Sequence, residues 1–198
     1  MTHEIVLWGL GHTNAHVLDM WRKRPIPDAR LTCVSNFPIA TYSGMLSGVL
    51  AGQYAPRQME IDLVRLCASA QARLIVDEVS GLDPASQTLE FTNRPPIKFD
   101  VLSIGIGSVT KIDRLKITKG APLLIKPMQT FLQRLEQALR EIRNDGSRKL
   151  HVLVVGGGAA GIEIACCVSN YIRQALGNIP LQAKLVHAGT ELLSESGS

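Results

Sequence analysis

Residues Leu150–Val168 read LHVLVVGGGAAGIEIACCV, an apolar run followed by spaced glycines and a second apolar segment. The run ending at Val155 predicts a buried β-strand, and the segment from Gly161 onward predicts a helix. Between them Gly156, Gly158 and Gly161 form the pattern G-x-G-x-x-G. The first glycine permits a tight turn, the second lets a pyrophosphate approach the backbone, and the third lets the helix pack close to the strand. This order predicts a dinucleotide-binding turn, and the alternative is a glycine-rich turn without a ligand.

A second unit of the same kind begins the chain. Glu4–Trp8 predicts a strand, and Gly9–Ala15 (GLGHTNA) supplies a glycine turn in which Asn14 stands where the third glycine would be. His12–Arg24 has the apolar spacing of a helix, and Arg30–Ser35 predicts the next strand. Strand, glycine turn, helix and strand within about 30 residues form the βαβ unit that binds dinucleotides.

Neither unit has the acidic residue that normally contacts the ribose after the second strand. The first unit offers Ser35 and Asn36 there, whose hydroxyl and amide can hydrogen-bond ribose hydroxyls. The second unit offers His187 after the strand predicted at 183–186. Because no carboxylate would repel a 2′-phosphate, both NADH and NADPH remain open as ligands.

The chain between the two units contains one segment with a predicted binding role. Residues 36–54 are rich in small side chains and predict a loop and a short helix that lie against a planar cofactor ring. Tyr42 and Ser43 are the expected polar contacts, and a plain surface helix is the alternative. The other predicted elements are an amphipathic helix over 61–70, a hairpin over 73–91 that turns at 83–86, a buried strand over 99–104 and an amphipathic helix over 128–142.

Composition excludes several classes of protein. The 198 residues carry a net charge of +4 that is dispersed along the chain, without the aromatic-interleaved basic stripe of a nucleic-acid-binding protein. Four cysteines and five histidines show no close ligand spacing, so no metal site is expected, and buried, reduced thiols are expected. The N-terminus lacks a signal-peptide pattern, and no apolar run approaches the ~18 residues of a spanning helix. The expected location is the cytoplasm or the plastid stroma.

Several segments resemble a known superfamily. The two glycine units and FDVLSIGIGS (99–108) resemble the two-dinucleotide-fold FAD/NAD(P)-dependent pyridine nucleotide-disulfide oxidoreductases. The segments GLGHTNAHVL (9–18), RLTCVSNFPIATYSGMLSGVLAGQY (30–54) and APLLIKPMQTFL (121–132) are similar to the NADH dehydrogenase-like flavin domains fused to selenide, water dikinase. They resemble type II NADH dehydrogenases and sulfide:quinone reductases more distantly.

The resemblance implies a fold and a division of the chain. The fold is an α/β, FAD/NAD(P)-binding Rossmann-like domain of three layers (ββα) with a β-meander, plus the start of a second Rossmann-like unit. Residues 1–147 would form the N-terminal part of an FAD-binding domain, and residues 148–198 an incomplete NAD(P)-binding domain. Members of the superfamily continue beyond the point matched by residue 193, so the chain is expected to be an N-terminal portion. Such an incomplete unit is expected to allow homodimers or domain-swapped oligomers.

The resemblance also implies an activity. An FAD-dependent NAD(P)H oxidoreductase would transfer hydride from NAD(P)H to flavin and on to a small-molecule acceptor that the sequence does not identify. A non-catalytic dinucleotide-binding or regulatory module, linked to selenophosphate synthesis, is the alternative. No catalytic acid, base or metal is expected. The cofactor-binding residues would be Gly9, Gly11, His12, Thr13, Asn14, Ser35, Asn36, Tyr42, Ser43, Val79, Gly105, Gly107, Gly156, Gly158, Ala160, Gly161, Glu163 and His187.

Overall fold

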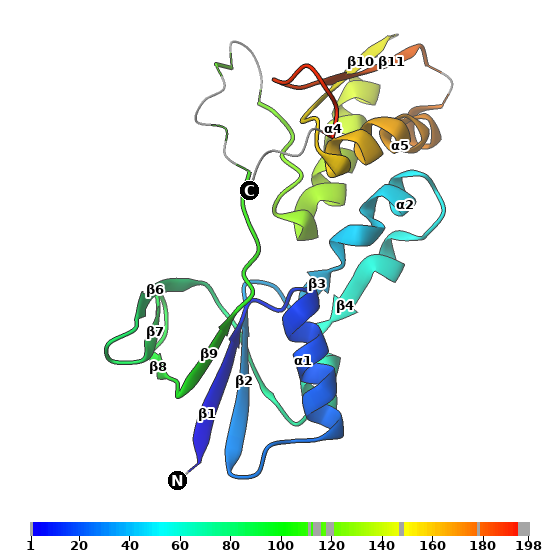
Figure 1. The fold of residues 1–198 in the computed structure, drawn as a ribbon. Coiled ribbons are helices and arrows are strands. Elements are labelled where there is room, and N and C mark those ends of the chain that lie inside the picture. The colour runs from blue at the N-terminus through cyan, green and yellow to red at the C-terminus, as the bar shows by residue number, and fades with distance from the viewer. Residues whose placement is uncertain are drawn as a thin grey trace. The chain divides into compact units, whose positions relative to one another are not determined.

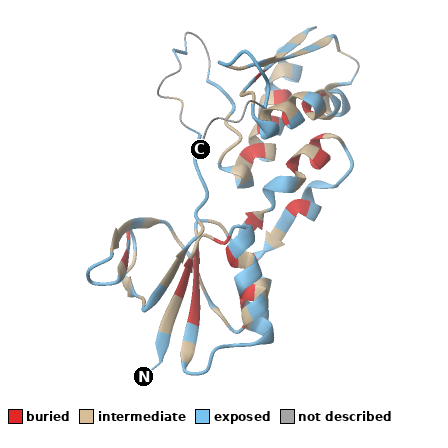
Figure 2. Ribbon diagram, in the orientation of Figure 1, coloured by how far each residue is buried: buried red, intermediate tan, exposed pale blue. Residues whose placement is uncertain are grey.

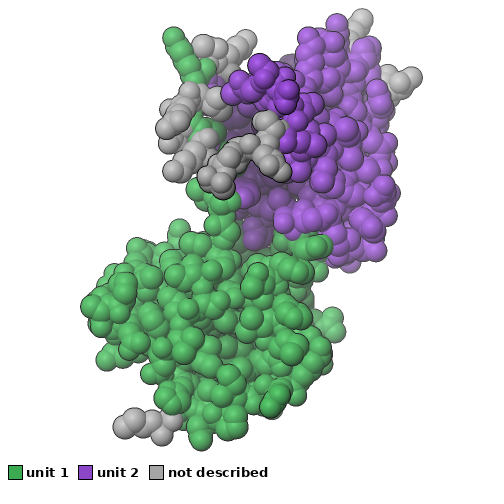
Figure 3. Space-filling model, viewed as in Figure 1, with its two compact units in different colours: residues 1–42, 60–116 green, residues 43–59, 117–198 purple. Residues whose placement is uncertain are grey.

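The structure is a computed structural model that describes residues 2–110, 112, 116–117, 121–146, 149–177 and 179–193. The chain separates into two compact units (Figure 3). Unit 1 comprises residues 1–42 and 60–116, and unit 2 comprises residues 43–59 and 117–198. These units reflect packing within the chain, and the domain boundary after residue 147 remains a prediction.

A parallel sheet forms the centre of unit 1 (Figure 1). Its strands, in the spatial order β5-β2-β1-β9, are β5 (Arg73–Val76), β2 (Ala29–Ser35), β1 (His3–Trp8) and β9 (Val101–Ile104). In the central register Ile5 pairs with both Leu31 and Val101. The helix α1 (His12–Lys23) connects β1 to β2, which is the predicted βαβ arrangement.

Two layers cover this sheet, because successive residues of a strand face opposite sides. On one side Leu7 and Cys33 pack with the helices α1 and α3 (Leu63–Ser69). On the other side Val6 and Val34 pack with Leu89 of a three-stranded antiparallel meander. The buried parts of the strands lie between these layers (Figure 2). The predicted three-layer α/β fold with a meander is therefore confirmed.

The meander also corrects a predicted element. We expected one hairpin over residues 73–91, but its first half forms two strands in different sheets. β5 joins the parallel sheet beside β2, and the chain then enters β6 (Val79–Asp83), which pairs with β7 (Thr88–Phe91). β8 (Ile97–Lys98) completes the meander. The hydrogen bond from the Asp77 amide to the Ser35 carbonyl continues the pairing of β5 with β2 just beyond Val76, and the chain then leaves the parallel sheet.

The helix predicted over residues 61–70 begins later than expected. Residues 60–62 form β4 (Glu60–Asp62), which pairs with β3 (Ile39–Thr41). Asp62 then caps α3, since its carboxylate accepts a hydrogen bond of 2.9 Å from the Arg65 amide. An aspartate at this position satisfies an otherwise unpaired backbone donor, and it therefore fixes the start of the helix at Leu63.

Unit 2 contains a parallel strand pair and several helices. Its elements are the 3-10 turn η1 (Ser43–Met45), α2 (Leu46–Leu50), η2 (Pro56–Met59), η3 (Met128–Thr130), α4 (Phe131–Asn144), β10 (Leu150–Val155), α5 (Ala159–Leu176) and β11 (Leu181–Val186). The predicted apolar face of α4 is confirmed, because Phe131, Leu135 and Leu139 are buried in one cluster with Ile164 and Val168 of α5. Unit 2 thus repeats the strand, glycine turn, helix and strand order of unit 1.

Burial of three predicted segments differs from expectation. In β10 Val154 is buried, but Leu153 and Val155 are 60% and 62% exposed. β10 pairs only with β11 in the described chain, so one face of this pair packs on helices and the other faces outward. Likewise Ile104 of the edge strand β9 is exposed. Cys166, expected to be a buried thiol, lies on the exposed side of α5.

Across the described residues we find no helix with the length and apolar character required to cross a membrane.

Candidate dinucleotide-binding turns

The first glycine turn follows β1 at the carboxyl edge of the parallel sheet in unit 1. Gly9 has a φ of +81° and donates its amide to the Val34 carbonyl at 2.8 Å. A Cβ placed on Gly9 would lie 2.5 Å from the carbonyl oxygen of Gly105, at the end of β9. Both the backbone conformation and the close approach of the two segments therefore require glycine at this position.

Asn14 replaces the third glycine and is 1% exposed. Its side-chain amide donates to the Gly9 carbonyl at 2.7 Å, and its Oδ1 accepts from the Ser103 hydroxyl at 2.8 Å. The side chain thus joins the turn to β9 from the first turn of α1. Sequence reasoning identified Asn14 but missed Ser103, whose only signal was a hydroxyl within the otherwise apolar stretch VLSI.

The N-terminus of α1 presents backbone donors next to this turn. Gly11 is the N-cap, with extended backbone and no side-chain capping hydrogen bond. The first intrahelical bond is from Ala15 to Gly11, at 2.9 Å. The amides of His12, Thr13 and Asn14 therefore precede the first helical hydrogen bond, as expected of a phosphate-binding helix end. The ring of His12 lies 5.1 Å from that of Tyr42, and both residues are exposed.

The other predicted residues of unit 1 have varied surroundings. The Ser35 hydroxyl accepts from the Phe37 amide at 3.3 Å, and Asn36 is exposed at the end of β2. Val79 lies at the start of β6, and its side chain packs in the cluster between sheet and meander. Gly105 is beside the first turn, whereas Gly107 is exposed with open space around it and a φ of +75°.

The second glycine turn connects β10 to α5 in unit 2. Gly156 has a φ of +133° and donates to the Val186 carbonyl at 2.8 Å. A Cβ on Gly161 would overlap the carbonyl oxygen of Gly156 and lie 2.9 Å from its carbonyl carbon. A Cβ on Gly158, in contrast, would meet no atom within 4 Å. Gly161 therefore allows the helix to pack closely on the turn, and Gly158 leaves open space over it; occupation of that space by a pyrophosphate remains a prediction.

Gly157 is a further position that sequence reasoning missed. A Cβ there would lie 2.8 Å from the Cβ of His187, the half-buried residue that follows β11. The Gly157 carbonyl also accepts from the Leu193 amide at 3.1 Å. The only sequence signal was a third consecutive glycine, which the G-x-G-x-x-G pattern does not require. His187 thus lies beside the turn, and its contact with a ribose remains a prediction.

The start of α5 matches the start of α1. Gly158 is its N-cap without a side-chain capping hydrogen bond, and the first helical bond runs from Ile162 to Gly158 at 3.1 Å. Ala160 is exposed in the first turn, and Glu163 is exposed just beyond it. Burial raises the pKa of the Cys167 thiol, and the neighbouring Cys166 and Glu163 raise it further. Ser43, the remaining predicted residue, is exposed at the start of η1.

Within the described residues, no group of three or more histidine, cysteine, aspartate or glutamate side chains is arranged to hold a metal ion. Both turns share backbone features that are typical of phosphate-binding helix N-termini. Each turn combines closely spaced glycines, a helix N-terminus without a side-chain cap and the carboxyl edge of parallel strands.

No family model matches the sequence. The chain is 26% identical over 165 residues to NADH dehydrogenase-like protein YutJ from Bacillus subtilis (strain 168), a match covering 82% of this chain and 44% of that protein. Among solved structures, NDH2 from Plasmodium falciparum in complex with NADH aligns with a TM-score of 0.71 and 15% identity. The alignment covers 98% of this chain and 43% of the NDH2 chain. The chain has the fold of the FAD/NAD(P)-binding pyridine nucleotide oxidoreductases.

A second oxidoreductase structure supports the same fold. The ferredoxin reductase for the CYP199A2 system from Rhodopseudomonas palustris aligns with a TM-score of 0.72 and 18% identity, over 97% of this chain and 44% of that one. The predicted resemblance to pyridine nucleotide oxidoreductases is therefore confirmed. The chain spans less than half the length of each of these relatives.

Proposed function

We propose that the chain is the N-terminal part of an FAD-dependent NAD(P)H oxidoreductase. FAD would bind at the turn of residues 9–14 in unit 1, and NAD(P)H at the turn of residues 156–161 in unit 2. The observation that carries the proposal is the occurrence of two such turns, each ending a parallel strand and opening an uncapped helix. NADH is named in complex with the related NDH2, and the curated relative is NADH dehydrogenase-like.

The residues of the two turns fit diphosphate groups. Gly11 and Gly158 are the N-caps, and their missing side chains leave the helix amides open to an anion. His12 and Thr13 would contact the phosphates of FAD at the first turn, and His187 would contact the ribose of NAD(P)H at the second. When bound, the two cofactors supply the hydride chemistry, and the protein binds and orients them.

The remaining predicted residues have roles consistent with this proposal. Ser35 and Asn36 would approach the FAD ribose at the end of β2, and Val79, Gly105 and Gly107 would contact FAD through the backbone. Tyr42 and Ser43 would lie near the flavin, and Ala160 and Glu163 near the nicotinamide cofactor. The acceptor is proposed to be a small molecule that receives electrons from the flavin.

The test uses two variants that the backbone tolerates. Gly158→Val places a side chain in open space, at an N-cap with φ of −77°. We expect the wild-type chain to bind FAD and to lose its visible flavin band on anaerobic addition of NADH or NADPH. Gly158→Val should keep the flavin and lose reduction by either nucleotide, while dithionite still bleaches it.

The matched variant at the other turn is Gly11→Val, whose Cβ would meet only the Gly105 carbonyl oxygen at 3.4 Å. It should lose FAD and keep NADH binding, and the exposed His16→Gln should behave as wild type. A wild-type chain that binds neither cofactor would refute the proposal. Nucleotide binding without flavin reduction would instead favour the second candidate, a non-catalytic dinucleotide-binding module such as one linked to selenophosphate synthesis.

A further inference from the structure

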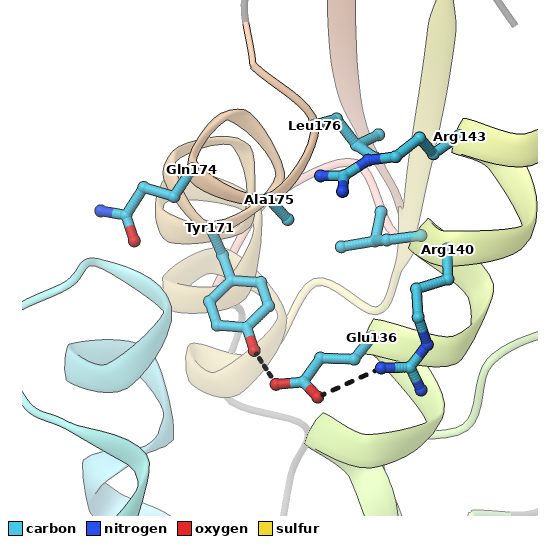
Figure 4. Close-up of a pocket in the computed structure, with 8 residues that line it drawn as sticks. Glu136, Arg140, Arg143, Tyr171, Gln174, Ala175 and Leu176 are labelled. Atoms are coloured by element: carbon cyan, nitrogen blue, oxygen red, sulfur yellow. Dashed lines mark hydrogen bonds and ion pairs between the residues drawn. The ribbon is translucent and has the colours of Figure 1, made fainter. Parts of the chain in front are cut away.

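A cavity of about 340 Å³ lies between α4 and α5 in unit 2, and the proposed function does not use it. It is lined by Glu136, Leu139, Arg140, Arg143, Tyr171, Gln174, Ala175 and Leu176 (Figure 4). Glu136 lies near the middle of α4, and the other residues lie in the C-terminal halves of the two helices. At 1.5 Å per residue, Gln174 is about 24 Å along α5 from the turn at Gly158, so this cavity is separate from the dinucleotide turn.

Charge is distributed unequally over the walls of this cavity. The Glu136 carboxylate accepts a hydrogen bond from the Tyr171 hydroxyl at 2.9 Å and lies 3.9 Å from the Arg140 guanidinium. Burial, together with the Glu136 carboxylate, raises the pKa of Tyr171 to about 12, so the phenol remains a neutral donor. Arg143 has no acidic partner among the described residues. Two guanidinium groups and one carboxylate thus leave one positive charge uncompensated.

The other wall is apolar. Leu139 is buried at the base, and Ala175 and Leu176 are half-buried on α5. The side chain of Arg143 extends from α4 toward Leu176 across this surface (Figure 4). Arg143 is exposed in the last turn of α4, where the helix dipole favours a cation, and its side chain lies along the apolar side of the cavity with the guanidinium accessible to a ligand.

We propose that this cavity binds a small amphipathic monoanion, a carboxylate with a short aliphatic or aromatic body. The guanidinium of Arg143 would pair with the carboxylate, since its planar donors match the two oxygens. The body would lie against Leu139, Ala175 and Leu176. The volume is at the lower end of the range for small-molecule sites, roughly 300–1,000 Å³, which suits such a ligand better than a second dinucleotide.

The experiment uses octanoate as the probe and the intact chain with labelled leucine methyl groups. Octanoate should cause saturable NMR shifts of the Leu139 and Leu176 methyls with a stoichiometry of one. Arg143→Gln should weaken octanoate binding about tenfold, because it removes the charge-assisted pair and leaves the apolar wall. The control Arg173→Gln removes an exposed arginine of α5 that does not line the cavity, and it should leave the affinity unchanged.

Octanol tests the role of charge with the same aliphatic body. It should bind the wild-type chain about tenfold more weakly than octanoate, and Arg143→Gln should not weaken it further. The proposal would be overturned if octanoate gave no saturable shift at Leu139 and Leu176, if Arg143→Gln and Arg173→Gln had equal effects, or if octanol and octanoate bound alike. None of these readouts depends on FAD or NAD(P)H, so failure of the proposed function would leave this test intact.

Discussion

Replacing Asn14 with alanine should loosen the first glycine turn and destabilise unit 1. The wild-type side chain is buried and holds two partners, the carbonyl of Gly9 at 2.7 Å and the hydroxyl of Ser103 at 2.8 Å. Alanine removes both hydrogen bonds at once and leaves the Gly9 carbonyl without this donor. Because the turn ends β1 and faces the end of β9, the loss acts on the centre of the sheet.

The size of the effect follows from these contacts. Each hydrogen bond contributes about 1 kcal/mol net, and a buried group left unpaired costs about 1–3 kcal/mol. Ser103 is half-buried, so water can satisfy its hydroxyl in part. Alanine also favours the helix by about 0.6 kcal/mol relative to asparagine. We therefore expect Asn14→Ala to lower the free energy of unfolding by about 3 kcal/mol and Ser103→Ala by about 1 kcal/mol. The double variant should reveal a coupling of about 1 kcal/mol.

Tryptophan fluorescence during urea unfolding measures this change selectively, since both tryptophans, Trp8 and Trp21, lie in unit 1. Asn170→Ala is the matched control. This exposed asparagine donates to the Ala51 carbonyl at 2.8 Å within unit 2. Its loss should therefore leave the urea midpoint of the fluorescence-detected transition unchanged. An Asn14→Ala midpoint equal to wild type, or additive effects of Asn14→Ala and Ser103→Ala, would refute the structural role assigned to this side chain.

Two further predictions concern unit 2. Gly161→Ala should lower the melting temperature measured by circular dichroism. Its Cβ would overlap the Gly156 carbonyl, and overpacking costs about 1–3 kcal/mol, more than the helix gains. Gly158→Ala, with open space at its Cβ, should lower the melting temperature less, because only the weaker preference of alanine for an N-cap opposes folding. Tyr171 should titrate at a pKa of about 12 by ultraviolet difference spectroscopy, and Glu136→Gln should lower this pKa by removing the carboxylate charge. Because folding raises the Tyr171 pKa, its stabilising contribution should be complete below pH 10 and decline as pH rises toward 12. An unchanged pKa in Glu136→Gln would contradict the assigned cause.

Element order was predictable because glycine turns and apolar runs are local signals. The strands β1, β2, β10 and the helices α1, α4 and α5 lie where their periodicity predicts them. The split of residues 73–91 was not predictable in the same way. Leu74 and Val76 alternate as in a strand, and Val79 follows three residues later. The end of β5 at Val76 is set by pairing with β2, which is distant in the sequence.

Burial was less predictable than element type. An apolar run such as Leu153–Val155 fits a strand covered on both faces, as central parallel strands commonly are. Whether each face is covered depends on how many strands and helices surround it, which no local pattern specifies. In unit 2 the pair β10–β11 has one packed face, so Val154 is buried and its neighbours are exposed. In unit 1 the central strand β1 has partners on both sides, and Val6 and Leu7 are both buried.

The two glycine turns show which part of a site a motif can predict. In unit 2 the helix approaches the strand because Gly161 has no side chain, as the motif implies. In unit 1 the same position holds Asn14, whose side chain fills the space and joins the turn to β9. This solution needs two further residues, since Ser103 donates to Asn14 and a Cβ on Gly105 would lie 2.7 Å from the Asn14 amide nitrogen. Asn14, Ser103 and Gly105 are therefore one interdependent set, and a glycine at position 14 would lack the link that this set provides.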